Sequence, residues 1–328
     1  MRVAVIGAGS MGGMHSQLLG GMPDVEVLVV DADAARAEAV ASNAAGRAVT
    51  EAQALDEADA VIVATPASMH SALVESAIAR DLPTLCEKPL TDDLASSIEL
   101  VELVERAGAH VEVGFQRRHD PGFVAARQAV ADAGRVHLLR LTAFDPRVVD
   151  RTAESWAAGE AAPLFLHSSV HDFDFVRWIS GSEVAEVSVD GSRRDGSRPA
   201  DVRGVETAVI TMRLESGALA VLEATWLHPG GYDIRAEILT ERAHISAGLS
   251  PRTPARHIDW IEPSDAWIGY LQRFEVAYRV ELAAFVAAVR GECPPASVAR
   301  DGLEALRIAV AATRAYVERR TVSLAEVA

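Results

Sequence analysis

The sequence has few cysteines, no long apolar run and comparatively little positive charge, and each shortage excludes a class of protein. Cys86 and Cys293 are the only cysteines among 328 residues. Two cysteines are too few for a disulfide framework and suit a reducing compartment. No apolar run reaches the ~18 residues that a membrane-spanning helix needs, and the chain opens on a predicted strand rather than a signal peptide. We therefore expect a cytoplasmic protein without a membrane partner.

The balance of charge argues against nucleic acid as a partner. The chain has 47 Asp and Glu residues against 31 Lys and Arg residues, a net charge of −16 at pH 7. An acidic surface repels phosphate backbones. The 49% apolar and 24% charged residues are typical of a globular protein. At this length we expect two domains, because one core rarely holds so long a chain.

The first residues have the pattern of a dinucleotide-binding unit. The predicted strand Arg2–Ile6 is followed by a G-x-G-x-x-G motif, residues 7–12, and then by a predicted helix. The first glycine allows a tight turn, the second lets the backbone approach a pyrophosphate, and the third lets the helix pack closely on the strand. The residues expected to bind the cofactor here are Gly7, Gly9, Ser10, Met11 and Gly12.

Asp31 indicates which dinucleotide binds. It ends the second apolar run, 19 residues after Gly12. An acid at this place can bind both ribose hydroxyls of NAD and would repel the 2′-phosphate of NADP. Asp33 adds negative charge, whereas Arg36 is the nearby cation that could accept NADP. Asp31 could also be only a turn residue before the helix at Ala34. The order of strand, glycines, helix, strand and acid favours NAD, with NADP as the alternative.

Strands and helices continue to alternate to about residue 114. The predicted strands are 60–64, 82–86 and 110–114, and the predicted helices are 68–80 and 91–107. Apolar strands separated by amphipathic helices are typical of a parallel sheet covered on both faces, which binds ligands at the carboxyl ends of its strands. Three polar segments lie at such ends: Thr65-Pro66, Glu87-Lys88-Pro89 and Gln116-Arg117-Arg118. We expect Lys88 to lie beside the nicotinamide.

From about Arg135 the pattern changes to strands joined by short turns. The predicted strands are 136–143, 184–190, 205–214, 218–226, 233–239 and 244–247, and Glu215-Ser216-Gly217 forms one hairpin turn. This pattern predicts an antiparallel or mixed sheet. A helix over about 167–179 interrupts it, and two helices, 267–290 and 300–319, follow it.

Two histidines in the first of these helices, His167 and His171, are four residues apart and would share a helical face. They could be polar residues on a solvent-facing stripe. A metal site is disfavoured, because no third ligand stands at motif spacing and no H-E-x-x-H is present. The unperturbed imidazole pKa of about 6.5 suits proton transfer near neutrality. We favour a catalytic role and expect no metal.

Together these features resemble the Gfo/Idh/MocA oxidoreductase family along nearly the whole chain. The motifs that carry the resemblance are the glycine motif with His15, Ala64-Thr65-Pro66 with His70, Cys86-Glu87-Lys88-Pro89, residues 113–118, His171-Asp172-Phe173-Asp174 and Gly231-Tyr232-Asp233. The stretches 114–122, 231–237 and 273–285 most resemble the inositol 2-dehydrogenase group.

The resemblance implies an α/β fold with a Rossmann dinucleotide-binding domain over residues 1–119. It implies a second α/β domain over residues 120–328, built on a large, mostly antiparallel open sheet that binds substrate. The helix at about 300–319 could pack back on the first domain. The open face of the sheet would form a homodimer or homotetramer.

The resemblance also implies a reaction. Hydride would pass between a secondary alcohol of a polyol, sugar or sugar derivative and nicotinamide. Lys88 matches the family lysine, and His171 matches the histidine paired with it; a nearby ammonium would stabilise an alkoxide and favour a neutral, basic imidazole. The remaining expected cofactor contacts are Thr65, Pro66, His70, Glu87 and Lys88, and the expected substrate contacts are Arg118, Tyr232 and Tyr278.

The chain departs from the family pattern at two places. His167 stands where the family has Asp, and Asp145 lies in a segment that carries an imidazole in inositol dehydrogenases. We expect Asp145 to replace part of the lost carboxylate function. His167 would be a second proton carrier or a substrate ligand, and the substrate would be less cationic or more oxidised than is usual in the family.

Two other functions remain open. One is a non-catalytic NAD-binding regulator, which the presence of Lys88 disfavours, since such relatives tend to lose this lysine. The other is a different family reaction, such as reduction of an imine or of a double bond.

Overall fold

The computed structural model describes residues 1–146, 164–193, 195–198, 204–248 and 267–327. The chain divides into two compact units. The first unit consists of Met1–Gln116 and Tyr278–Leu303, and the second consists of Arg117–Ala277 and Glu304–Ala328. The domain boundary expected between residues 119 and 120 stays a prediction. None of the helices in the described part of the chain combines the length and the apolar character that crossing a bilayer requires.

The first unit contains a six-stranded parallel sheet with the order β3-β2-β1-β4-β5-β6. Its strands are β1 (Arg2–Ile6), β2 (Glu26–Val30), β3 (Arg47–Ala48), β4 (Ala60–Val63), β5 (Thr84–Cys86) and β6 (Val111–Val113). Every residue of β4 and β5 is buried, so both faces of the sheet are covered there, as predicted. The strand order reverses between β1 and β4, which is where such sheets bind ligands.

The helices of this unit agree with the predicted alternation. They are α1 (Ser10–Gly20), α2 (Ala34–Asn43), α3 (Glu51–Glu57), α4 (His70–Ile78) and α5 (Leu94–Ala107), with a 3-10 turn, η1 (Ala67–Met69), before α4. The sequence did not predict β3 or α3, because elements of two and seven residues are too short to show a period. A second 3-10 turn, η2 (Gln116–His119), follows β6 at the junction of the two units.

A helix from late in the chain completes the core of the first unit. The predicted helix 267–290 is two helices, α8 (Tyr270–Arg273) and α9 (Glu275–Val289), which are separated at the buried Phe274. Leu282 and Phe285 of α9 pack in one cluster with residues of β1 and β2. Each is fully buried, which stabilises the fold by roughly 1.5–3 kcal/mol per side chain.

The second unit contains a seven-stranded sheet with the order β12-β11-β7-β10-β9-β8-β13. Its strands are β7 (Val136–Pro146), β8 (Val184–Ser192), β9 (Thr207–Leu214), β10 (Leu219–His228), β11 (Asp233–Thr240), β12 (His244–Ala247) and β13 (Val322–Ser323). Only β7 and β10 pair in parallel, so the sheet is mostly antiparallel, as expected. The hairpin predicted at 215–217 joins β9 to β10, and Gly217 has the positive φ that its turn needs.

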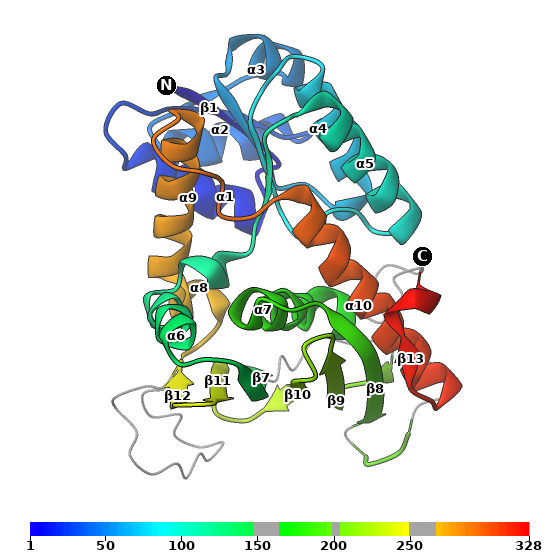
Figure 1. The fold of residues 1–328 in the computed structure, drawn as a ribbon. Helices are drawn as coiled ribbons and strands as arrows, with labels where there is room; N and C mark the ends of the chain where they lie inside the picture. The colour runs from blue at the N-terminus through cyan, green and yellow to red at the C-terminus, as the bar shows by residue number, and fades with distance from the viewer. Residues whose placement is uncertain (147–163, 194, 199–203, 249–266, 328) are drawn as a thin grey trace. The chain divides into compact units, whose positions relative to one another are not determined.

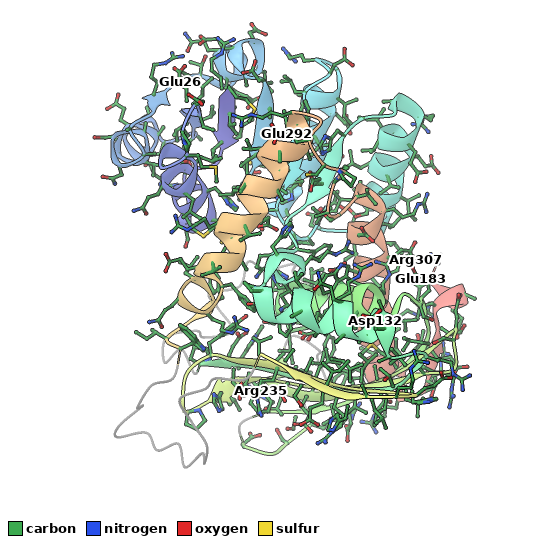
Figure 2. All side chains as sticks on the ribbon, turned by 60° about the vertical axis from the view of Figure 1, so that its left-hand side comes forward. Glu26, Asp132, Glu183, Arg235, Glu292 and Arg307 are labelled. Atoms are coloured by element: carbon green, nitrogen blue, oxygen red, sulfur yellow. The ribbon has the colours of Figure 1, made fainter. Side chains whose placement is uncertain are left out.

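Helices cover one face of this sheet (Figure 1). They are α6 (Pro121–Asp132), α7 (Val170–Ser180) and α10 (Ala299–Glu318), whose residues from Glu304 belong to this unit, and a short turn, η6 (Leu324–Glu326), follows β13. Side chains alternate along the strands: Ile210, Leu222 and Ile238 are fully buried on the helix side, and the other face exposes Val209, Leu219 and Leu239. Figure 2 shows Asp132 on the helix side of the sheet and Arg235 on β11.

The helix predicted over 167–179 begins later than expected. The α-helix α7 starts at Val170, and His167 lies before it in a single π-helical turn, η4 (Leu164–Ser168). Four-residue spacing places two side chains on one face only within a continuous α-helix. The prediction that His167 and His171 share a helical face was therefore wrong.

Candidate active site

The glycine motif lies between β1 and α1, and two of its glycines are required by the fold itself. Gly7 has a φ of +102°, and a Cβ added there would lie 2.5 Å from the carbonyl oxygen of Ala64. A Cβ on Gly12 would lie 1.7 Å from the carbonyl oxygen of Gly7. Without these glycines α1 could not pack so close to β1.

Gly9 is different, because the protein leaves open space around it. A Cβ on Gly9 would meet no atom within 4 Å, and its φ of −72° suits any residue. Gly9 is the N-cap of α1 and provides no side-chain cap, so the first N–H groups of the helix remain available to an anion. A ligand that needs close approach to the backbone, such as a pyrophosphate, accounts for glycine at this position.

A cavity of about 970 Å³ adjoins the glycine motif. Its volume is at the upper end for small-molecule and cofactor sites. The expected cofactor residues that line it are Gly7, Gly9, Ser10, Met11, Asp31, Thr65 and Pro66. Arg36, Thr50 and Gln53 also line it, and the last two precede or lie on the unpredicted α3. The residues present therefore fit a dinucleotide.

The carboxylate of Asp31 is fixed at the edge of this cavity. It accepts hydrogen bonds from the backbone N–H groups of Ala8, at 2.7 Å, and Asp33, at 2.8 Å. Burial by itself would raise the pKa of Asp31, but these amides and the charge of Arg36 bring it below its usual value. Arg36 lies 3.6 Å from one oxygen of Asp31 and 3.6 Å from one oxygen of Asp33, so two acids already engage this cation.

His70 connects two of the polar segments at the strand ends. It is buried, with Nδ1 3.0 Å from the carbonyl oxygen of Pro89 and Nε2 2.9 Å from that of Thr65. His70 thus holds Thr65 against the segment that follows β5. The Lys88–Pro89 peptide bond in that segment is cis.

Glu87 points into the interior and anchors the start of the same segment. Its Oε1 lies 2.7 Å from Nε2 of His15, and its Oε2 accepts from the backbone N–H of Lys88 at 3.2 Å. A Cβ on Gly114 would lie 3.2 Å from the Glu87 carboxyl carbon, so that glycine makes room for the acid. Burial would raise the pKa of Glu87, but His15 and Lys88 lower it overall. Glu87 is therefore an anion beside Lys88, which is the only lysine of the chain.

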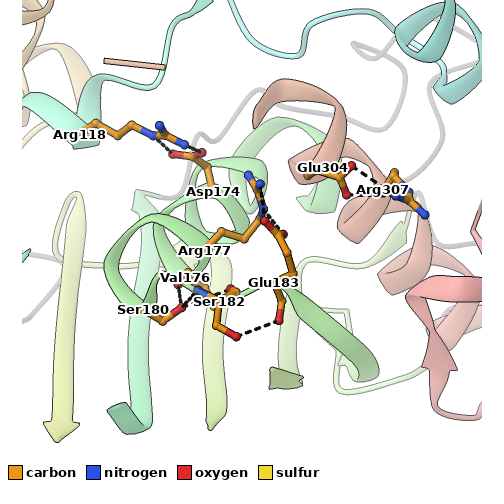
Figure 3. Close-up of polar contacts among 9 residues, drawn as sticks. All are labelled: Arg118, Asp174, Val176, Arg177, Ser180, Ser182, Glu183, Glu304 and Arg307. Carbon is orange, nitrogen blue, oxygen red and sulfur yellow. Dashed lines mark hydrogen bonds and ion pairs between the residues drawn. The ribbon is translucent and has the colours of Figure 1, made fainter. Parts of the chain in front are cut away.

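Helix α7, which carries His171, is held rigidly in the second unit. Its residues from Val170 to Arg177 are all buried. Two paired sets of hydrogen bonds tie it down: Arg118 donates through Nε and Nη2 to Asp174, and Arg177 does the same to Glu183 at the start of β8 (Figure 3). Double ion pairs of this kind fix orientation, and the pair of Arg118 and Asp174 is buried. The expected contact of Arg118 with substrate stays a prediction.

A second buried cluster joins Arg117, Asp172 and Tyr232. Arg117 donates to Oδ1 of Asp172, whereas Oδ2 of that acid has no hydrogen-bond partner among the described residues. Burial raises the pKa of Asp172, and the charge of Arg117 opposes this rise. Burial and the charge of Asp145 raise the pKa of Tyr232. The sequence predicted Asp145 and Tyr232 as site residues but missed the pair of Arg117 and Asp172, whose partners lie 55 residues apart.

The other expected site residues are distributed over both units. Lys88 and Tyr278 belong to the first unit, where the Tyr278 ring packs edge-on to His15 with 6.2 Å between centroids. His167 belongs to the second unit and is half-buried. In the second unit Asp145 also accepts a hydrogen bond from Ser168 at 2.9 Å. Among the described residues no group of three or more His, Cys, Asp and Glu could hold a metal ion.

Comparison with known proteins matches both parts of the chain to one family. Residues 1–115 match the family model described as "Oxidoreductase family, NAD-binding Rossmann fold", and residues 127–324 match "Oxidoreductase family, C-terminal alpha/beta domain". A myo-inositol dehydrogenase of Streptomyces leeuwenhoekii, Hyg17, is 38% identical and covers 96% of this chain and 97% of its own. A myo-inositol 2-dehydrogenase of Thermotoga maritima is 32% identical over 100% of this chain and 99% of its own. The crystal structure of a probable dehydrogenase from Thermotoga maritima superposes with a TM-score of 0.88 at 30% identity, over the whole of both chains.

Proposed function

The chain belongs to the Gfo/Idh/MocA oxidoreductase family, and we propose that it is an NAD-dependent dehydrogenase that oxidises a secondary alcohol of a polyol or sugar derivative. Relatives over nearly the full chain are named as myo-inositol dehydrogenases. The observation that carries the cofactor part is the open space at Gly9, beside the uncapped N-terminus of α1. The protein itself gives no reason for glycine there, whereas a bound pyrophosphate does.

NAD is the preferred dinucleotide. The ionised and oriented carboxylate of Asp31 lines the cavity where an adenosine ribose would bind. A 2′-phosphate would have to approach this anion, and Arg36 is already shared between Asp31 and Asp33. When bound, NAD supplies the hydride acceptor, C4 of its nicotinamide.

Lys88 and His171 together assist the proton transfer. An alcohol has a pKa far above 7, so hydride leaves readily only as the hydroxyl proton departs to a base. We assign that base to His171, and we assign stabilisation of the developing alkoxide to the ammonium of Lys88. His167 is a second proton carrier or a substrate ligand. The other substrate contacts in this proposal are Arg118, Asp145, Tyr232 and Tyr278.

The proposal also covers the kind of substrate and the oligomeric state. His167 replaces a family carboxylate, which supports a less cationic or more oxidised substrate than is usual in the family. Val209, Leu219 and Leu239 are 46%, 43% and 44% exposed on the outer face of the large sheet. These apolar side chains support a homodimer or homotetramer that forms through that face. The proposed location of the protein is the cytoplasm.

A cofactor-reduction assay tests the proposal. Purified protein would be mixed with NAD or NADP and a panel of inositols, aldoses and sugar acids, and reduced cofactor would be followed by absorbance. We expect turnover with NAD that Lys88→Ala abolishes and that Lys88→Arg, which keeps the charge, retains in part. Tight NAD binding without turnover on the whole panel would instead support the non-catalytic regulator.

A further inference from the structure

Glu281 is a buried acid that the proposed reaction does not use. It lies on α9, on the same face as Leu282 and Phe285, and is 3% exposed. Neither of its carboxyl oxygens has a hydrogen-bond partner among the described residues. A buried carboxylate without a partner is strongly disfavoured, so such a group keeps its proton. An acid in the apolar stripe of a helix is also a sequence signal, which was missed.

Two other acids act on Glu281, and both already have hydrogen-bond partners of their own. Glu87 is hydrogen-bonded at each of its oxygens. Glu112 is also engaged at both oxygens, with Oε1 2.8 Å from Nε2 of His110 and Oε2 3.2 Å from the backbone N–H of Ala296. Burial and the negative charges of Glu87 and Glu112 raise the pKa of Glu281 well above its usual range. Burial and these neighbours therefore favour the neutral form of Glu281.

Helix α9, which carries Glu281, also contacts the ion pair of His15 and Glu87. Tyr278, one turn before Glu281 and on the same buried face, packs edge-on to His15. His15 in turn is bound to Glu87. Because residues three apart on a helix are neighbours, Glu281 lies on the side of α9 that faces this pair.

We propose that Glu281 is a positioning residue, which stays a neutral carboxylic acid so that Glu87 can remain the anion that holds His15 and the backbone of Lys88. Glu281 takes no part in hydride or proton transfer and acts only through Glu87. Its effect on turnover rests on the proposed function, whereas its charge state is a property of the first unit alone.

Loss of the Glu281 proton as the pH rises would place a second negative charge beside Glu87. The ionisable groups around this change are Glu87 after β5 and Glu112 on β6, with His15 bound to the first, His110 bound to the second, and Tyr278 on α9 itself. Lys88 is linked to the change through its neighbour Glu87. Like charges in one site repel, and an added anion favours the charged form of a nearby ammonium. The ionisation of Glu281 should therefore be visible at Lys88.

Because Lys88 is the single lysine, the ionisation of Glu281 can be measured through it without an activity assay. Growth on lysine labelled with carbon-13 gives one Cε signal, that of Lys88, whose shift would be followed by NMR against pH. We expect the wild-type curve to show, besides the titration of the Lys88 ammonium itself, a second inflection. This second inflection should be absent from Glu281→Gln, which cannot ionise, and should persist in Glu292→Gln, which removes an exposed acid near the end of α9 (Figure 2). Identical titration curves for the wild type and Glu281→Gln would overturn the assignment of the proton.

The pH profile of turnover tests whether Glu281 affects the reaction through Glu87. Glu281→Gln should lose a step in the pH profile of kcat that the wild type shows, with KM for NAD unchanged. Glu281→Leu, which also cannot ionise, should lose the same step of the pH profile. A purely structural Glu281 would leave the pH profile of the folded variants unchanged. If the wild type turns over no polyol, the proposed function fails, while the NMR titration still decides the charge state.

Discussion

Substitution of Gly9 by alanine should change the affinity for NAD without lowering the stability of the fold. The added Cβ would meet no protein atom within 4 Å, and the backbone at Gly9, with φ −72° and ψ −163°, is accessible to alanine. Folding should not be weakened. Alanine restricts the unfolded chain more than glycine does, which would add about 0.4–1 kcal/mol of stability, but glycine is the better N-cap residue by a similar amount, so the free energy of unfolding should stay nearly unchanged.

Binding of NAD should respond in the opposite direction. In the proposed complex the space beside Gly9 is occupied by the pyrophosphate, so the new methyl group must displace the ligand or distort the loop. Inserting a methyl group into a packed site costs about 1–3 kcal/mol. That cost corresponds to an NAD affinity about 5- to 150-fold weaker.

Two neighbouring glycines provide matched controls. A Cβ on Gly13 would make an ordinary contact, 3.8 Å from Cγ2 of Val40, so Gly13→Ala should stabilise α1 by about 0.5–1 kcal/mol and leave NAD binding unchanged. Gly12→Ala, with its Cβ 1.7 Å from a carbonyl oxygen, should lose stability by about 1–3 kcal/mol or more. Denaturant unfolding and fluorescence titration with NAD would measure both effects. Wild-type NAD affinity in Gly9→Ala would refute the placement of the pyrophosphate.

Three further predictions concern acidic side chains. Asp31→Asn should bind NAD at least about tenfold more weakly, since a hydrogen bond to a charged group is lost. It should bind NADP better than the wild type does, because the anion that repels the 2′-phosphate is removed. Equal weakening for both cofactors in titrations would contradict this. Asp174→Asn should lower the free energy of unfolding by about 3–5 kcal/mol, because it leaves the guanidinium of Arg118 buried without its full partner; a loss below about 1 kcal/mol in denaturant melts would exclude this explanation. Glu281 keeps its proton in the folded state after the unfolded chain has lost it, so its folded pKa lies above the unfolded value and stability should fall as pH rises between the two. The fall should be about 1.4 kcal/mol per pH unit and absent from Glu281→Gln; a pH-independent difference between the two proteins would disprove it.

Elements with a clear local pattern were predictable from the sequence. The glycine motif, the apolar strands β1, β2, β4, β5 and β6, and the hairpin at 215–217 were predicted at nearly their observed positions. Each depends on neighbours in the chain, since alternation, helical periodicity and turn residues act over a few residues. Asp31 belongs to the same class, because its place at the end of β2 follows from the strand itself.

Other features depend on contacts between distant segments. The partners in the pair of Arg117 and Asp172 are separated by 55 residues, and nothing in either segment alone indicates the other. The π-helical turn that holds His167 is irregular, so a periodic pattern extended the helix too far.

The sequence by itself determined the α/β class, the position of the dinucleotide motif and the residue types available for chemistry. The tertiary structure decided which charges are paired, and therefore which are fixed as anions. Glu281 illustrates the physical reason. Its protonation depends on burial and on two acids from β5 and β6, more than 160 residues earlier in the chain, and these meet it only when α9 packs against the first sheet.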